Sequence, residues 1–591
     1  MTTPQAASQP IRRRVRLALL AALMALALLL LADLRFRGLV WRFAWANTGE
    51  AEPIAQLRGL VELGGNLIRT PLDTRPITPI QHVESYPYGV NTFLQKEVEE
   101  PKLRVMLAMI RDAGLRWLRQ EFPWEDLEVD GRGQFTDARN DLDGDGQPDT
   151  IDAWAKYDRL VSLVEEHGLR LLVRLSNPPD WAQAANAGNF APPADLQDFV
   201  NYATAVAQRY KGRIRHYQIW NEPNIYPEWG ENFADPVAYT DMLCRTYAAL
   251  KAVDPQIVVV SAAIAPTISL DGFMGYQDLA YLQRMYDSGA AACFDVMAAQ
   301  AYGLFSGALD RRMRLTSVTV ARHLYYRDLM VANGDAHKPI WLSEAAWNPV
   351  LDAPLPRQQI ADFSRFGEAT LQEAADNMPL LYERARREWP WVGAIFYWFF
   401  TRPDPSEMGQ SFFYFRMVEP DYQPYKPTFT ALPVYHAVRN YLTTLRPRLY
   451  QGVHQAEHWA IQRRADRALT VDGAAFGQAQ QVDSLRLAYG GTSVWLRYQS
   501  DEPLDVWQGE QRVAQLPASP EQWALRSVWS GGWAEGELDV QAQDGASFIV
   551  DSVIVRDDSW QAWPALLVLG VLMALGLLEL AYAAWARLNA P

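Results

Sequence analysis

The sequence predicts an α/β protein: a (β/α)8 TIM barrel over residues 80–445, then an antiparallel β-sandwich over residues 446–559, flanked by N- and C-terminal transmembrane helices. Three observations support this prediction. Eight short apolar runs alternate with helical patterns between residues 80 and 440, which is typical of βα units. Beyond Leu449, short strands with glycine turns replace the helical periodicity. Each end of the chain also carries a long apolar run.

The N-terminal apolar run, residues 17–32, follows a cluster of arginines at positions 12, 13, 14 and 16. It suits a signal-peptide core or a short anchor, and we favour an uncleaved anchor because no small-residue cleavage site follows the run. Residues 1–36 are therefore predicted to be a cytoplasmic basic tail with a signal-anchor helix, and residues 37–79 a linker. Basic flanks remain in the cytoplasm, so the chain that follows is expected on the extracytoplasmic side of the cell membrane.

The C-terminal run, residues 564–586, has the full length of a membrane span and carries Trp563 and Trp585 at its edges. Residues 560–591 are therefore predicted to be a transmembrane helix with a short tail. Together the two runs place both termini inside and the domains between them outside.

The predicted barrel strands are defined by apolar runs that each precede a helical pattern. Between the third and fourth runs, residues 194–211 place Leu196, Phe199, Val200 and Ala203 on one helix face, and Gly212 follows as a helix stop. In this fold the chemistry lies at the carboxyl ends of the strands. The eight runs cover residues 88–91, 116–120, 170–175, 215–220, 256–262, 294–299, 339–343 and 392–398.

Composition excludes some classes of function. A net charge of −14 argues against a nucleic-acid partner, which would need a concentrated basic surface. The two cysteines, Cys244 and Cys293, are too few for a disulfide framework or a thiolate metal cluster, and their pairing stays open. The 22 Trp and 26 Tyr residues suit a protein that lays aromatic faces against sugar rings.

Two glutamates end two of the predicted strands. Glu222 follows the fourth strand in Trp220-Asn221-Glu222-Pro223, and Glu344 ends the seventh in Trp341-Leu342-Ser343-Glu344. Strands four and seven lie on opposite sides of a barrel mouth, so the two carboxyl groups are expected to face each other. Cleavage of a glycosidic bond needs one carboxyl group to protonate the leaving oxygen and another to attack the anomeric carbon or to activate water. The separation of the two groups, which decides between retention and inversion, is not readable from sequence.

The motifs Asn221-Glu222-Pro223 and Trp341-x-x-Glu344 resemble those of clan A glycoside hydrolases, which are retaining enzymes on this barrel. With residues 116–124 and 177–182 included, the chain is most similar to family 39, and family 5 is the next nearest. The resemblance covers residues 80–440 and implies a glycosidase that acts on O-glycosidic bonds of an oligo- or polysaccharide. It implies no cofactor for catalysis.

By this resemblance, Glu222 is the general acid/base and Glu344 the nucleophile, and Asn221 donates to the 2-hydroxyl of the sugar. Arg119 would hold Glu344 ionised. Tyr302 and Trp398 match the tyrosine that contacts the nucleophile and the aromatic floor of the sugar site.

Position 300 departs from the family pattern, because Gln300 stands where the family usually has His. A glutamine can donate a hydrogen bond to a sugar hydroxyl but cannot titrate. The reaction type is unaffected by this change, whereas the substrate stays open. Trp124, Trp181, Trp229 and Trp347 also follow predicted strands and are candidates for stacking on sugars or for ordinary loop packing.

An acidic loop between the second predicted strand and its helix has the ligand spacing of a calcium site. Glycine occupies its sixth position, as in an EF-hand loop, but its twelfth residue is Asp where Glu is usual. The alternative is a solvated acidic turn. We predict a structural Ca²⁺ there, with the ligands Asp141, Asp143, Asp145, Gln147, Asp149 and Asp152.

The predicted sandwich contains strands at residues 484–488, 492–498, 523–528, 537–542 and 547–555, and it is either a carbohydrate-binding module or a spacer. The expected partners are therefore a glycan and a membrane, and protein partners are not indicated. Two rivals to hydrolysis remain: a glycan-binding barrel without turnover, and a transglycosylase of exopolysaccharide assembly.

Overall fold

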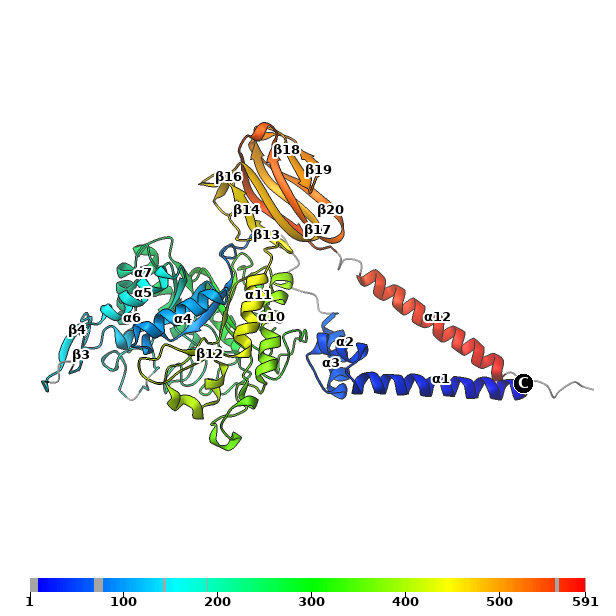
Figure 1. The fold of residues 1–591 in the computed structure, drawn as a ribbon, viewed down its shortest axis with the longest axis horizontal. Helices are drawn as coiled ribbons and strands as arrows, with labels where there is room; N and C mark the ends of the chain where they lie inside the picture. The colour runs from blue at the N-terminus through cyan, green and yellow to red at the C-terminus, as the bar shows by residue number, and fades with distance from the viewer. Residues whose placement is uncertain are drawn as a thin grey trace, which may run out of the picture.

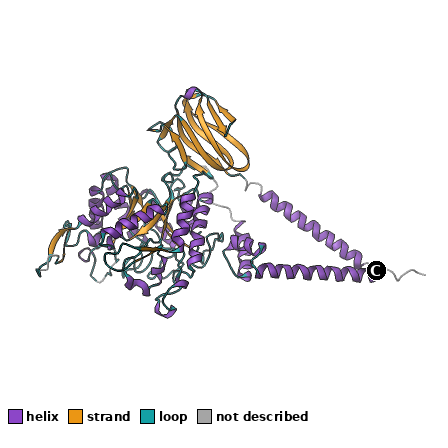
Figure 2. Ribbon diagram, viewed as in Figure 1, coloured by secondary structure: helices purple, strands orange, loops and turns teal. Residues whose placement is uncertain are grey.

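The computed structural model describes residues 9–67, 78–141, 145–185, 187–188, 190–558 and 563–589 (Figure 1). A helix-covered barrel and a domain made mostly of strands lie next to each other, and two long helices extend away from them (Figures 1 and 2). The predicted order of an α/β domain followed by a β domain is confirmed.

Within the described residues, eight parallel strands form the barrel sheet in the order β7-β6-β5-β2-β1-β10-β9-β8. A parallel bridge between Val260 and Val296 joins the two outer strands, so the sheet closes on itself. The eight predicted runs all fall on these strands. Their bounds are β1 Tyr88–Thr92, β2 Trp117–Pro123, β5 Arg170–Ser176, β6 His216–Ile219, β7 Val258–Val260, β8 Met297–Tyr302, β9 Ile340–Ala346 and β10 Val392–Tyr397.

Helices cover the outside of the barrel, and their ends follow from local sequence. The predicted helix at residues 194–211 is α6, which Asp195 caps by accepting a hydrogen bond from the N–H of Gln197. Thr370 and Glu373 form a reciprocal capping box at the start of α10. The covering helices are α4 Glu100–Asp112, α5 Trp154–Glu166, α6 Leu196–Arg209, α7 Pro236–Val253, α8 Asp278–Asp287, α9 His323–Ala332, α10 Leu371–Glu388 and α11 Pro433–Thr444.

Large side chains fill the inside of the barrel below the carboxyl ends of its strands. Trp117 and Trp341 meet there with ring centroids 5.5 Å apart, and Leu172, Val260 and Phe396 complete the layer. These side chains fill the barrel interior, so a ligand is expected to bind at the carboxyl ends of the strands.

The C-terminal domain differs from the prediction in strand length. Residues 484–488 and 492–498 belong to one strand, β17 Ser484–Ser500, and residues 523–528 and 537–542 belong to β20 Ser519–Ala542. Gly490 and Gly491 therefore lie inside a strand, beside a register shift, where we expected a turn. The other strands are β13 Gly452–Gln455, β14 Ile461–Arg464, β15 Arg467–Leu469, β16 Ala479–Val482, β18 Leu504–Gln508, β19 Gln511–Leu516 and β21 Phe548–Arg556.

Both terminal apolar runs form helices, α1 Gln9–Arg35 and α12 Trp563–Asn589. Among the residues that the structure describes, no helix is both long enough and apolar enough to cross a membrane, so the two predicted spans are not supported. The segment predicted as a linker contains two helices, α2 Leu39–Thr48 and α3 Pro53–Leu67.

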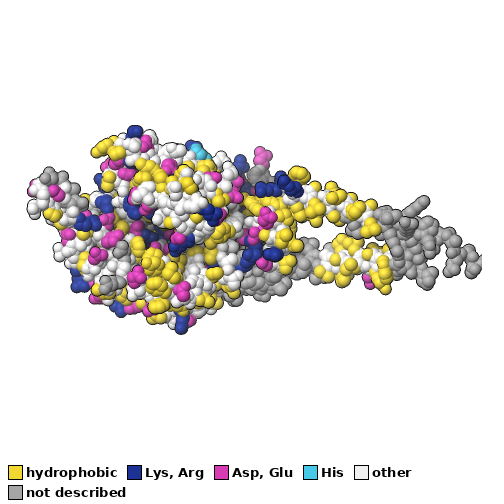
Figure 3. Space-filling model, turned by 90° about the horizontal axis from the view of Figure 1, so that it is seen from below, with side chains coloured by type: hydrophobic (Ala, Val, Ile, Leu, Met, Phe, Trp, Pro, Cys, Tyr) yellow, Lys and Arg dark blue, Asp and Glu magenta, His cyan; other side chains and the backbone are white. Residues whose placement is uncertain are grey.

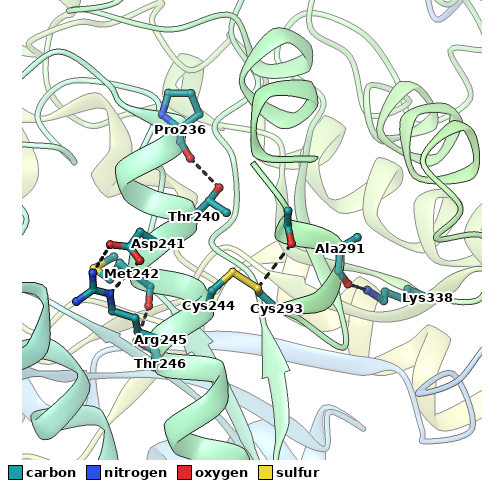
Figure 4. Close-up of a disulfide and its surroundings, with 11 residues drawn as sticks. Pro236, Thr240, Asp241, Met242, Cys244, Arg245, Thr246, Ala291, Cys293 and Lys338 are labelled. Atoms are coloured by element: carbon teal, nitrogen blue, oxygen red, sulfur yellow. Dashed lines mark hydrogen bonds and ion pairs between the residues drawn. A yellow bond between two sulfur atoms is a disulfide. The ribbon is translucent and has the colours of Figure 1, made fainter. Parts of the chain in front are cut away.

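Cys244 of α7 and Cys293 form a disulfide, which answers the question that the sequence left open (Figure 4). Cys293 precedes the first residue of β8, Met297, so the bond lies at the amino-terminal end of the barrel strands. Lys338 donates to the carbonyl of Ala291 nearby, at the same end. The disulfide therefore stabilises the barrel away from the carboxyl ends where the site residues lie.

Candidate active site

The two predicted carboxyl groups line one cavity of about 720 Å³ at the carboxyl ends of the barrel strands. Glu222 follows β6 and Glu344 lies in β9, as the sequence predicted. The amide of Gln300, at the end of β8, joins them: its Nε2 donates to Glu222 Oε1 at 2.6 Å and to Glu344 Oε2 at 3.1 Å. One donor thus spans the gap between the two acids.

Glu222 occupies an unusual backbone position. Its φ is +42°, and that of Trp220 is +72°, both in the left-handed region that side chains other than glycine rarely adopt. The N–H of Glu222 donates to the carbonyl of Ala263 at 3.0 Å, which holds the chain in this conformation. The turn directs the carboxyl group of Glu222 into the cavity as the chain leaves the barrel.

Glu344 is surrounded by hydrogen-bond donors. Arg119 Nη1 donates to Oε1 at 2.7 Å, and the Tyr302 hydroxyl donates to Oε2 at 2.6 Å. Gln300 supplies a third donor. These three donors fix the position of the Glu344 carboxyl group in the cavity. Burial and the neighbouring Glu344 charge raise the pKa of Tyr302 well above its usual value, so the hydroxyl keeps its proton.

Arg119 is held by groups from several strands. Its Nε donates to Gln218 Oε1 at 2.6 Å, Nη1 also donates to Asn91 Oδ1 at 2.8 Å, and Nη2 donates to Asn221 Oδ1 at 2.8 Å. The sequence did not predict Gln218 or Asn91. A polar residue inside an otherwise apolar strand was the available signal for both, since such a residue must find a partner within the barrel.

The surroundings of Glu222 favour the protonated form of its carboxyl group. Burial, then the charge of Glu344 and then that of Glu228, raise the pKa of Glu222 to about 8. At neutral pH Glu222 is therefore largely protonated. A protonated Glu222 beside a second carboxyl group held by cationic and neutral donors is an arrangement that can give a proton to a bound ligand.

Glu228 is a third carboxyl group in the cavity that the sequence analysis missed. Burial raises its pKa to about 7, and the charge of Arg174 and a hydrogen bond with the side chain of Asn221 oppose that rise. Arg174, which forms an ion pair with Glu121, also lines the cavity. Arg174 interrupts an apolar strand and was detectable in the sequence, whereas Glu228 lies in an irregular loop with no periodic signal.

The predicted tryptophans do not all reach the cavity. Trp398 lines it, as expected. Trp124 is fully buried and donates to Glu128, and Trp181 packs against it at 5.5 Å. Trp347 is buried and donates to the carbonyl of Ser306. Trp124, Trp181 and Trp347 do not line the cavity and are packing residues.

The predicted calcium loop joins two antiparallel strands, β3 Thr136–Asn140 and β4 Asp149–Asp152. Asp149 and Asp152 lie three positions apart in β4, so their side chains leave opposite faces of the strand. Asp152 accepts a hydrogen bond from the N–H of Trp154 at 3.0 Å, at the start of α5. In the described residues no three His, Cys, Asp or Glu side chains could hold a metal together. Asp143 lies outside the described residues, and the calcium site is not confirmed.

The remaining predicted ligands of this loop have local roles. Asp141 accepts a hydrogen bond from the N–H of Gly146 at 2.9 Å, and Asp145 accepts one from the N–H of Gln147 at 2.8 Å. These contacts are those of tight turns, in which a side chain satisfies the backbone.

No protein-family model matches the sequence, and no curated protein matches it either. Solved structures do resemble the fold. A family 39 glycoside hydrolase from Bacteroides cellulosilyticus is 16% identical with a TM-score of 0.43, over 79% of this chain and 83% of the other. A β-xylosidase from Caulobacter crescentus is 15% identical with a TM-score of 0.41, over 82% of this chain and 98% of the other.

A glucosidase from Croceicoccus marinus is 12% identical with a TM-score of 0.40, over 80% of this chain and 97% of that protein. At these identities and TM-scores, the likeness assigns neither a family nor an activity. The chemistry of this chain therefore has to be inferred from the geometry of its own cavity.

Proposed function

We propose that the chain hydrolyses O-glycosidic bonds of an oligo- or polysaccharide by double displacement, with Glu344 as nucleophile and Glu222 as general acid/base. The bridge made by Gln300 carries this proposal. Its two hydrogen bonds limit the distance between Glu222 Oε1 and Glu344 Oε2 to at most about 5.7 Å, the sum of 2.6 and 3.1 Å. Retaining glycosidases separate these groups by about 5–5.5 Å, and inverting ones by about 6.5–9.5 Å.

In the first step, a Glu344 oxygen attacks the anomeric carbon while Glu222 gives its proton to the departing glycosidic oxygen. The glycosyl group is then bonded to Glu344. In the second step, Glu222, now a carboxylate, takes a proton from water as the water oxygen displaces Glu344. Arg119 and Tyr302 hold Glu344 through both steps, which favours its role as leaving group in the second.

The cavity walls suit a sugar. Trp398 lines the cavity and supplies an aromatic face, and Asn221 is oriented by Arg119, which occupies its carbonyl oxygen. The Asn221 amide nitrogen also bonds with Glu228, and its second N–H is the group that can donate to a hydroxyl. The cavity volume lies within the range of about 300–1,000 Å³ of ordinary ligand sites.

Trapping the covalent intermediate tests the mechanism. We expect one member of a panel of 2-deoxy-2-fluoro glycosides to label the chain, and peptide mass spectrometry to place the label on Glu344. Glu344→Gln should not be labelled. Glu125→Gln, which removes another cavity carboxylate, is the matched control and should be labelled normally. Labelling at Glu125, or normal turnover by Glu344→Gln, would refute the assignment.

Product analysis tests the outcome of the reaction. Proton NMR of the first product should show the anomeric configuration of the substrate, because two inversions restore it. An inverted product would exclude the double displacement. Products longer than the substrate would instead identify the chain as a transglycosylase, which uses the same two residues. Binding of glycans without turnover is disfavoured because both carboxyl groups are retained.

We also propose that α1 and α12 attach the chain to a membrane, with the barrel on the extracytoplasmic side. Their described side chains support attachment, since Leu28 and Leu29 of α1 and Leu578 and Leu580 of α12 are each at least 65% exposed. The disulfide supports an oxidising compartment. Flotation of the full chain with lipid vesicles, and protease protection in cells, test the two parts of this proposal.

A further inference from the structure

The segment between α1 and the barrel carries an apolar surface that the barrel does not cover. We call residues 36–64 the α2–α3 hairpin. In α2, Trp41, Ala44 and Thr48 are buried, whereas Leu39 and Phe43 are 82% and 64% exposed. The buried and the exposed residues alternate with helical spacing. One face of α2 therefore packs against the protein, and an apolar face points outward.

The second helix repeats this arrangement. Ile54, Leu57 and Val61 are spaced three and four residues apart and are 69%, 65% and 71% exposed. Gln56, on the other side, is buried and donates to the carbonyls of Trp41 and Glu50. Leucine, isoleucine and valine in one exposed stripe are unfavourable in water and mark a surface that meets an apolar partner.

Ion pairs between the hairpin and the barrel hold the polar face of the hairpin inward and leave its apolar face outward. Glu50 accepts from Arg312 Nη1 at 2.6 Å, and Glu62 accepts from Arg314 Nε at 2.5 Å. Arg312 is itself held by Asp310 at 2.8 Å. These arginines belong to the loop that follows β8, so the hairpin is docked on the barrel by its polar side, and its apolar stripes cannot turn inward.

The exposed arginines beside the apolar faces of α2 and α3 favour a lipid surface over a water-soluble protein partner. Arg35, Arg37, Arg42 and Arg58 are all exposed. The guanidinium of Arg35 lies 6.0 Å from the ring centre of Phe36, which is 80% exposed. Arginines and aromatic rings beside an apolar stripe are the composition of helices that lie in the headgroup region of a bilayer, where anionic lipids attract the cations.

The hairpin is continuous with α1. Three residues, 36–38, separate the end of α1 from the start of α2, so a lipid-bound α1 would bring the hairpin to the same surface. Hydrophobic side chains run along both helices that extend from the body, and Lys and Arg side chains gather where one of them meets it (Figure 3).

From this continuity and the two-faced helices, we propose that the α2–α3 hairpin lies flat in the interface of a lipid bilayer and holds the barrel at a fixed orientation. The proposal rests on the membrane attachment proposed above. The hairpin is joined by ion pairs to the loop that begins after Tyr302, so the barrel cannot rotate freely on the membrane.

Spin labels test this placement in the full chain, which has no cysteine outside its disulfide and so accepts single added cysteines. Labels at Leu57→Cys and Phe43→Cys are compared with a label at Tyr425→Cys, an 89% exposed barrel position. The chain is bound to vesicles of phosphatidylcholine and phosphatidylglycerol. Collision rates with oxygen, which partitions into lipid, and with a soluble nickel chelate are then measured.

We expect the oxygen-to-nickel collision ratio of the two hairpin labels to exceed that of the Tyr425→Cys label by about fivefold or more. A ratio equal to that of the control, in chains that float with the vesicles, would refute the interfacial hairpin and leave the attachment proposal standing. Chains that do not float would refute both. Strong spin–spin broadening between hairpin labels of different chains would identify a second copy as the occupant, and would also refute the proposal.

Discussion

Glu222 should make the protein less stable as the pH rises, and its replacement by Gln should remove that dependence. Burial raises the pKa of Glu222 from 4.5 to about 8 in the folded state. Above pH 4.5 the unfolded chain releases the proton while the folded chain keeps it. The folded state therefore binds more protons, and its stability falls with increasing pH until about pH 8.

The size of this effect follows from the two pKa values. One pKa unit corresponds to about 1.4 kcal/mol, so the cost is below about 1 kcal/mol at pH 5 and about 3 kcal/mol at pH 7. Because part of the Glu222 side chain is exposed to the cavity, solvent screening lowers the cost at pH 7 to about 2 kcal/mol. Gln at position 222 has the same shape, still accepts the hydrogen bond from Gln300 and carries no such cost.

Differential scanning calorimetry at pH 5 and pH 7 measures the difference between the two proteins. The advantage in Tm of Glu222→Gln over the parent should grow by about 3 °C between these values. Glu521→Gln, which removes an exposed carboxylate of the C-terminal domain, is the matched control and should follow the parent at both pH values. An equal difference at pH 5 and pH 7 would show that Glu222 titrates normally, and the assignment of Glu222 as the acid would lose its electrostatic basis.

Three further changes test the contacts around the site and the fold. Tyr302→Phe removes the 2.6 Å hydrogen bond to Glu344 and should lower kcat by about 10- to 100-fold with unchanged circular dichroism; an unchanged kcat would exclude a role for that hydroxyl. Gln300→Leu removes a contact that lowers the pKa of Glu222, so the alkaline limb of kcat/KM should move to higher pH, and a downward move would contradict this reasoning. Replacing Cys244 and Cys293 by Ser opens a loop of 49 residues and should cost about 4 kcal/mol of stability, read as a fall in Tm, with unchanged kcat at 25 °C. Loss of activity in the folded double variant would contradict the conclusion that the disulfide lies too far from the cavity to affect catalysis.

Local sequence was sufficient to predict the barrel. Each of its strands is a short apolar run between helices and can be recognised on its own. Local sequence failed in the C-terminal domain, where Gly490 and Gly491 read as a turn but lie inside β17. Glycine permits both a turn and a strand irregularity, and only pairing with β20 decides between them. The calcium prediction stays unconfirmed for a related reason, since ligand spacing along the chain does not guarantee that Asp149 and Asp152 face the same side of β4.

The sequence by itself determined the order of the domains, the two strands that carry Glu222 and Glu344, and the residues Arg119, Asn221 and Tyr302 around them. Tertiary structure alone decided that Gln300 bridges the two acids, that Glu228 joins the cavity, and that Trp124 and Trp347 pack in the core and do not line the cavity. The physical reason is the range of the interactions. A strand and the position at its end follow from neighbouring residues, whereas a contact between side chains 44 and 78 positions apart exists only after the barrel has closed.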